Sequence, residues 1–182
     1  MSGGLEHHIG QPLQASGALL PLEGALRFVN RIVMVPCMLA LFAAAAILSY
    51  SVAARYFFKI PTEWQDETAV FLLVGGTFFS GAFVQSLRGH VGVEAIAGLL
   101  SERANHIRMI FVDGVSFAFC AFFSWKSWTL FHEAWVDGFT SNSTWGPALW
   151  IPYSLMATGM SLLTLQLLLE LSIRVSGKRS PR

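Results

Sequence analysis

Four long apolar stretches dominate the pattern of hydrophobic and polar positions along the chain. They cover residues 32–54, 68–87, 109–131 and 148–169, and three of them contain no charged side chain. A helix of about 20 apolar residues crosses the roughly 30 Å hydrocarbon layer of a bilayer. The pattern therefore predicts an all-α membrane protein with four transmembrane helices.

The third stretch, residues 109–131, differs from the others because it contains two charged side chains, Asp113 and Lys126. Each lies about one turn from an end of the stretch, where a long side chain can reach the membrane surface at reduced cost. Two interpretations stay open, namely interfacial anchoring and pairing with another helix or subunit.

The segment 93–107 has an amphipathic pattern between the second and third stretches. Glu94, Ser101, Glu102, Asn105 and His106 lie opposite its apolar stripe. Such a helix is too polar to span a bilayer and is typical of the membrane interface. We expect it to lie there or against a partner. The apolar stripe consists of Val93, Ile96, Ala97, Leu100, Ala104 and Ile107.

The two ends of the chain are polar. Residues 1–26 lack the early apolar core of a signal peptide and are expected to form a flexible tail. Residues 175–182 form a basic tail, and the transmembrane domain is expected over 27–174. Glu170 and Arg174 are spaced for an i,i+4 ion pair where the fourth span ends.

The distribution of lysine and arginine predicts the orientation in the membrane. Most of these residues flank the first span at its start, follow the second span or follow the fourth. Cytoplasmic loops carry the excess of Lys and Arg in membrane proteins. We therefore expect both termini and the amphipathic helix on the cytoplasmic side, and residues 132–147 on the outer side.

Composition excludes several classes of function. Charged residues make up 13% of the chain and hydrophobic residues 54%, whereas a soluble domain carries about 25% charged residues. The net charge of +1 gives no nucleic-acid signal. Cys37 and Cys120 both lie in apolar runs and form no CxxC motif, so neither a redox pair nor a zinc site is predicted.

Motifs of catalysis are missing from the sequence. It contains no hydrolase elbow, phosphate-binding loop or HExxH motif, and the middle of every predicted span lacks acids, bases and histidine. An autonomous proton-coupled transporter would usually need such a group there. We therefore predict a protein that is not an enzyme and that has an assembly, anchoring or accessory role.

Other functions stay open on the residues alone. A haem-b or redox-complex anchor would need two inward-facing histidines, but His90, His106 and His132 all lie outside the middle of the spans. A self-sufficient small transporter acting as a homo-oligomer and an unrelated four-helix scaffold are the remaining alternatives.

Polar residues cluster at the two ends of the second span. Trp64, Asp66 and Glu67 precede it, and Arg88, His90 and Glu94 follow it. Acidic residues at a helix N-terminus match the helix dipole, so the cluster is explained either by flanking charge or by an interface with another membrane protein. Within the span, small residues allow close approach of another helix. These are Gly75, Gly76, Ser80 and Gly81.

In the order and spacing of these motifs, the chain resembles the small membrane subunit (DctQ-type) of tripartite ATP-independent periplasmic (TRAP) transporters. The resemblance runs from about residue 27 to residue 174. The matching positions are Arg55 after span one, then Trp64, Asp66 and Glu67, Gly81, Arg88-Gly89-His90 and Glu94, and finally Pro147 to Tyr153 with Trp150, followed by Gly159.

The resemblance implies a multi-pass subunit of the bacterial inner membrane that binds a large polytopic subunit. That partner would hold the substrate and the coupling sodium ions and would move by an elevator-like mechanism. A periplasmic binding protein would deliver an organic-acid-type substrate. The small subunit would scaffold its partner among the membrane lipids and would need no cofactor or metal of its own.

The resemblance also suggests roles for individual residues. Arg55 and Trp64 would anchor the outer interface, while Asp66 and Glu67 would cap span two or pair with a partner cation. Lys126 is the best candidate for an ion pair between subunits. The remaining candidates are Arg88, His90 and Glu94 for the turn into the amphipathic helix, Gly75, Gly76 and Gly81 for close helix contact, and Trp150 for the interface.

Overall fold

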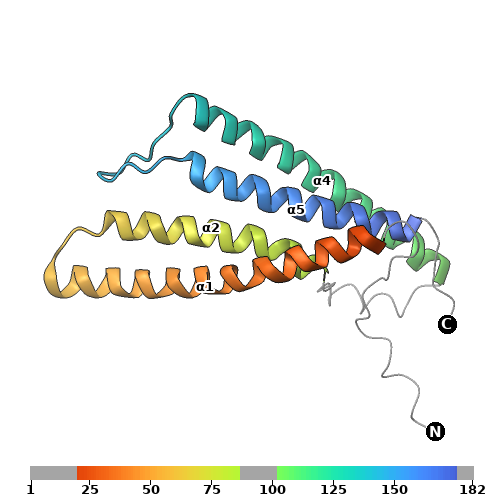
Figure 1. Cartoon of the computed structure of the whole chain (residues 1–182), viewed down its shortest axis with the longest axis horizontal. Helices are drawn as coiled ribbons and strands as arrows, with labels where there is room; N and C mark the ends of the chain where they lie inside the picture. The colour runs from red at the N-terminus through yellow and green to blue at the C-terminus, as the bar shows by residue number, and fades with distance from the viewer. Residues whose placement is uncertain (1–19, 87–101, 176–182) are drawn as a thin grey trace, which may run out of the picture.

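The computed structural model describes residues 20–86 and 102–175, and its regular elements there are four α-helices (Figure 1). All four are long and apolar enough to cross a membrane. The predicted all-α class with four spans is therefore confirmed. The helices are α1 (Leu20–Phe58), α2 (Glu63–Ser86), α4 (Glu102–Val136) and α5 (Trp150–Val175).

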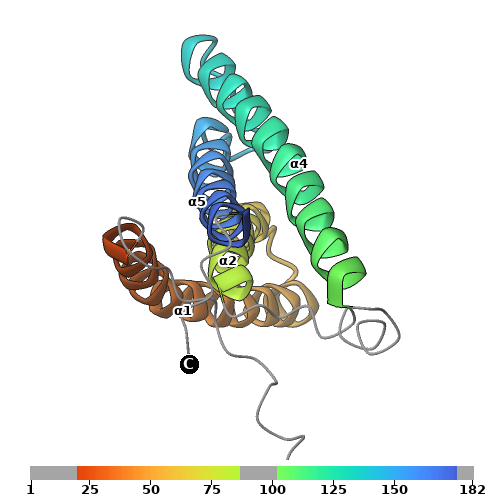
Figure 2. The same ribbon diagram turned by 90° about the vertical axis from the view of Figure 1, so that its right-hand side faces the viewer.

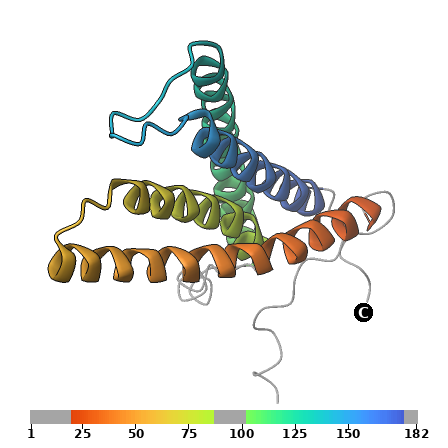
Figure 3. The same cartoon turned by 60° about the vertical axis from the view of Figure 1, so that its left-hand side comes forward.

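Helix α1 begins earlier than the hydrophobic pattern suggests. Its first turns, from Leu20, occupy part of the segment expected as a tail. They are held because Leu26 packs against Leu169 and Ile173 of α5. Pro36 lies inside this long helix, where it removes one backbone hydrogen bond. Figure 3 shows α1 bending in its N-terminal half, as an internal proline favours.

Helix α4 also extends beyond the predicted span, because it begins at Glu102. Residues 102–107 were expected to end a separate amphipathic helix, but they form the first turns of α4. Residues 93–101 of that predicted helix lie outside the described residues. With 35 residues, α4 is about 50 Å long and exceeds the thickness of the hydrocarbon layer.

The helices form two hairpins that meet through their inner members. Helix α2 packs against both α1 and α5, and α5 packs against both α2 and α4. Figures 1 and 2 show α1 and α4 on opposite flanks, with α4 crossing the others obliquely. Many large apolar side chains of α1 and α4 are consequently exposed, among them Phe28, Met38, Phe42, Phe111, Phe119 and Phe122.

Glycines bring the inner helices close together. A Cβ atom on Gly159 of α5 would lie 2.7 Å from the backbone carbonyl carbon of Phe78 in α2. Gly76 of α2 faces Leu41 of α1, whose side chain would be 3.0 Å from an added Cβ. Because α2 contacts both neighbours through such positions, close backbone approach sets the spacing of the bundle.

The connection between α4 and α5 is a folded loop, residues 137–149. Thr140 and Ala148 form an isolated antiparallel bridge, and the Leu149 N–H donates to the carbonyl of Phe139 at 2.9 Å. Gly138 and Gly146 adopt φ values of 66° and 57°, a region that glycine enters without strain. The loop therefore has a defined shape at the end of the bundle where α2 begins.

Candidate functional site

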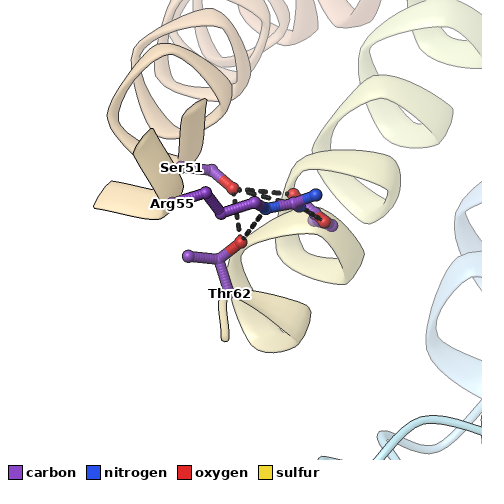
Figure 4. Close-up of polar contacts among 4 residues, drawn as sticks. Ser51, Arg55 and Thr62 are labelled. Carbon is purple, nitrogen blue, oxygen red and sulfur yellow. Dashed lines mark hydrogen bonds and ion pairs between the residues drawn. The ribbon is translucent and has the colours of Figure 1, made fainter. Parts of the chain in front are cut away.

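A polar cluster ties α1 to α2 at the end of the bundle where the α1–α2 and α4–α5 connections lie. We name it the loop-end cluster, and it consists of Ser51, Arg55, Thr62 and Asp66 (Figure 4). Ser51 Oγ lies 2.8 Å from Thr62 Oγ1 and 2.9 Å from Asp66 Oδ1. Ser51 and Thr62 are buried, so each hydroxyl needs the partner that the cluster provides.

Arg55 closes the loop-end cluster from the last turn of α1. Its guanidinium forms an ion pair with Asp66 and donates through Nε to the Thr62 hydroxyl. The Arg55 and Asp66 side chains are 54% and 40% exposed, so solvent screens their attraction. The cluster therefore fixes the geometry of the α1–α2 connection more through its buried hydroxyls than through its ion pair.

We expect Ser51→Ala to lower the free energy of unfolding by about 1–2 kcal/mol, because it removes a buried hydroxyl together with its contacts to Thr62 and Asp66. Arg55→Gln should cost less than about 1 kcal/mol, as is usual for exposed ion pairs. Thermal unfolding in mild detergent measures both effects. Ser49→Ala is the matched control, since Ser49 is exposed and its hydroxyl bonds only the Ala45 carbonyl. Equal losses at Ser49 and Ser51 would contradict the assignment.

Two acidic residues of α2 hold the folded loop. Glu63 accepts a hydrogen bond from the backbone N–H of Thr144 at 2.9 Å, and Glu67 accepts one from the Ser141 hydroxyl. The first turn of α2 thus positions residues 137–149 over the end of the bundle. Glu67, predicted to cap span two or pair with a partner cation, makes its described contact within the chain.

Trp64 and Trp150 lie at the same end. Trp64 is half exposed and lines a cavity with Pro61, Glu63, Thr144 and Trp145. Trp150, at the start of α5, stacks edge to face on Trp135 of α4 with ring centroids 4.9 Å apart. The stacked indoles of Trp135 and Trp150 therefore hold the end of α4 against the start of α5.

A second polar cluster joins three helices near the opposite end, and we name it the terminal-end network. It consists of Asn30 of α1, Gln85 of α2, and Gln166 and Glu170 of α5, all of them buried. Gln85 and Gln166 donate to the two carboxylate oxygens of Glu170 at 2.8 and 3.0 Å. Asn30 contacts the Gln166 side chain at 3.5 Å. Polar groups that would be costly in lipid thus bind one another.

A buried ion pair joins α4 to α5 beside this network. Arg174 Nε lies 2.6 Å from Asp113 Oδ2, and the side chains are 12% and 9% exposed. The structure thus gives Arg174 a partner on another helix, Asp113, in addition to the i,i+4 pairing with Glu170 that the spacing predicts. Of the two interpretations of Asp113, the structure supports pairing with another helix, because its carboxylate contacts Arg174 of α5.

The remaining predicted site residues are spread over the molecule. Lys126 is exposed on α4, with its Nζ 5.4 Å from the centre of the Trp125 ring. An added Cβ on Gly75 would lie 3.3 Å from Leu155 of α5, and one on Gly81 would lie 3.9 Å from Leu163. Three predicted residues, Arg88, His90 and Glu94, lie outside the described residues.

Sequence reasoning missed the residues that complete the two clusters. Ser51, Asn30 and Gln85 lie in apolar helices and belong to no motif. The available signal was their polarity, because a hydroxyl or amide inside a span needs a partner within the protein. Their partners lie up to 136 positions away in the sequence, so the pattern alone does not identify them.

Groups of three or more metal-ligating side chains are absent from the part of the chain that the structure describes. The arrangement there joins helices, positions a loop and exposes two apolar flanks. Comparison with known families extends this picture. The family described as "Tripartite ATP-independent periplasmic transporters, DctQ component" matches residues 44–176. No match to an individual curated protein was found.

The matched region includes the loop-end cluster, the folded loop and the Asp113–Arg174 pair, and it extends through the last turn of α5. It thus covers most of the chain, with residues 44–58 of α1 and the whole of α2, α4 and α5. The protein is therefore an integral membrane protein that belongs to the DctQ family, the small membrane subunits of TRAP transporters.

Proposed function

We propose that this chain is the non-catalytic scaffold of a sodium-coupled TRAP transporter in the bacterial inner membrane. It binds the large membrane subunit, which holds the sodium ions and an organic-acid-type substrate. A periplasmic binding protein delivers that substrate and docks only transiently. Both termini of this chain face the cytoplasm, and it uses no cofactor.

One observation carries this proposal, namely how the described helices use their polar side chains. The terminal-end network and the Asp113–Arg174 pair join helix to helix, so these groups face the interior of the chain. The outer flanks of α1 and α4 are exposed and mainly apolar instead, with Lys126 as a charged residue on α4. This distribution suits a protein that binds another membrane protein, and we assign ion and substrate binding to the larger partner.

The orientation rests on the basic residues and on the arrangement of the helices. Helices α1 and α4 begin, and α5 ends, on the same side of the bundle (Figure 1). Arg27 and Arg31 lie in the first third of α1, Arg108 in the second turn of α4 and Arg174 in the last turn of α5. Positive flanks favour the cytoplasmic side. The folded loop 137–149 then faces the periplasm, within reach of the binding protein.

We expect a larger polytopic membrane protein to co-purify in stoichiometric amount when this chain, tagged at its C-terminus, is isolated from its native membranes in gentle detergent. Mass spectrometry identifies the partner, and an unrelated tagged four-helix membrane protein from the same membranes is the control. The preparation should be colourless.

Two outcomes would contradict the proposal. Recovery of the chain alone, or only as a homo-oligomer, would favour a self-sufficient transporter, and reconstituted vesicles of the purified chain would then be tested for uptake. A Soret absorbance band would support a haem anchor instead. Sodium coupling is tested separately, by comparing uptake by the complete complex in sodium and in potassium buffers.

A further inference from the structure

Lys126 lies on the face of α4 that points away from the rest of the chain. The buried residues of α4 are Asp113, Ser124, Ser127 and Ala134, and they mark the side that packs on α5. Successive residues of a helix are 100° apart. This spacing places Lys126 about 80° to 160° around the helix from each of these four residues, outside the packed side. It shares that exposed face with Val115, Phe119 and Phe122, and we name these four residues the α4 outer face.

The depth of Lys126 makes its exposure informative. It lies 13 positions after Asp113 and 10 positions before the last residue of α4, Val136. At 1.5 Å per residue, these separations are about 20 Å and about 15 Å along the helix. Lys126 falls within the apolar stretch 109–131, five positions before its end, so its backbone lies inside the hydrocarbon layer near the loop end of α4. An ammonium group there is unfavourable against lipid tails alone.

Lys126 has no carboxylate within ion-pair distance among residues 20–86 and 102–175, where its described contact is the Trp125 ring. The other exposed flank is different. From Ile32 to Ala54, α1 carries no charge, so lipid tails can cover its exposed side chains. Of these two flanks, the α4 outer face is therefore the one with a charged group, the Lys126 ammonium, that an anionic partner would stabilise.

We propose that the α4 outer face is the surface on which this chain binds a transmembrane helix of the large subunit, with a carboxylate of that helix pairing with Lys126. Phe122, one turn before Lys126, shields the pair, and Val115 and Phe119 extend the apolar contact along α4. This inference rests on the proposed function and assigns the contact to one flank of the molecule.

Photo-crosslinking in native membranes tests which flank is in contact. A photoreactive phenylalanine analogue replaces Phe119 or Phe122 on α4, and Phe42 on α1 serves as the control because it is 77% exposed at a comparable apolar position. We expect crosslinks to the large subunit from both α4 positions and crosslinks to lipid only from Phe42. Crosslinks from Phe42 but not from α4 would overturn the inference.

Substitution of Lys126 tests the ion pair. Lys126→Leu should weaken association with the large subunit by about a hundredfold, because it leaves the partner carboxylate buried without a counter-ion. Lys126→Arg keeps the charge and should stay within a few-fold of the wild type. Quantitative co-purification over a dilution series in detergent measures both. Undiminished association of Lys126→Leu would overturn the pair and indicate that the lysine reaches lipid phosphates.

Two controls distinguish failure of the docking surface from failure of the proposed function. Thermal unfolding of the isolated chain should be little changed in Lys126→Leu, since the packed side of α4 is untouched. If the wild-type chain retains no large subunit at all, the proposed function fails. If the wild type retains it but the α4 variants behave like the α1 control, the docking surface alone is wrong.

Discussion

Gly159→Ala is expected to lower the free energy of unfolding by about 3 kcal/mol, at the upper end of the usual cost of overpacking. The added methyl group would lie 2.7 Å from the carbonyl carbon and 2.7 Å from the Cβ of Phe78. These atoms belong to the α2 backbone or are attached directly to it, so they cannot rotate away. Helices α2 and α5 must separate, and the two hairpins join through this contact.

A graded series of glycine replacements checks this explanation. At Gly76 the obstacle is the flexible side chain of Leu41, so alanine there should cost less than at Gly159. At Gly114 an added Cβ meets nothing within 4 Å, and alanine should be neutral or stabilising by up to about 1 kcal/mol. Unfolding midpoints in a dodecyl sulfate titration rank the three variants. A Gly159 variant as stable as the Gly114 variant would contradict the close packing.

The hydrophobic pattern was sufficient to predict the number and class of the helices. Uncharged runs of this length form transmembrane helices in a bilayer, because a helix satisfies its own backbone hydrogen bonds. The pattern was less informative about where the helices end. Helix α1 extends back to Leu20, since the contact of Leu26 with α5 and not hydropathy holds those turns, and α4 begins at Glu102.

The side-chain pairing was harder to predict, and Arg174 illustrates the reason. Its spacing from Glu170 fits an i,i+4 pair, which contributes only a few tenths of a kcal/mol at a surface. The structure brings Asp113 to the same arginine from 61 positions away in the sequence, and in a buried setting. A local rule cannot foresee a stronger partner that only the packing of α4 on α5 supplies.

Loop-end residues were predicted more fully, because their chemistry is concentrated in a short segment. Arg55 and Asp66 were singled out from the connector between the first two spans, and the structure pairs them. The buried Ser51 was missed because a serine in an apolar helix commonly bonds its own backbone, as Ser49 does here. Only the folded chain distinguishes the two serines.

The Asp113–Arg174 pair has a particular importance, since α4 packs mainly on α5. A purely apolar contact between two helices permits sliding and rotation, whereas polar contacts between fixed partners restrict both. Ser161 of α5 lies 3.0 Å from the Ser124 hydroxyl and 3.0 Å from Trp128 Nε1 of α4. The Asp113–Arg174 pair adds a charged contact eleven positions before Ser124 in α4. The α4 outer face would then be presented in one orientation. We therefore regard this pair as a device that positions α4.

Asp113→Leu is expected to lower the free energy of unfolding by about 3 kcal/mol, because it leaves the Arg174 guanidinium buried without its counter-ion. The loss should lie near the lower end for such pairs, since Arg174 is in the last turn of α5 and can partly turn toward the membrane surface. Glu133→Gln is the control, because Glu133 is exposed on the same helix and its loss should be within about 0.5 kcal/mol.

The double variant Asp113→Leu with Arg174→Met distinguishes a positioning role from a stabilising one. Replacing both charges by apolar groups removes the unpaired guanidinium, so the double variant should be more stable than Asp113→Leu alone. Its α4 should nevertheless be less well fixed on α5, and crosslinking from Phe122 to the large subunit should fall although the chain remains folded. If crosslinking stayed at the wild-type level, the remaining contacts between α4 and α5 would suffice to orient α4, and the ion pair would have no positioning role.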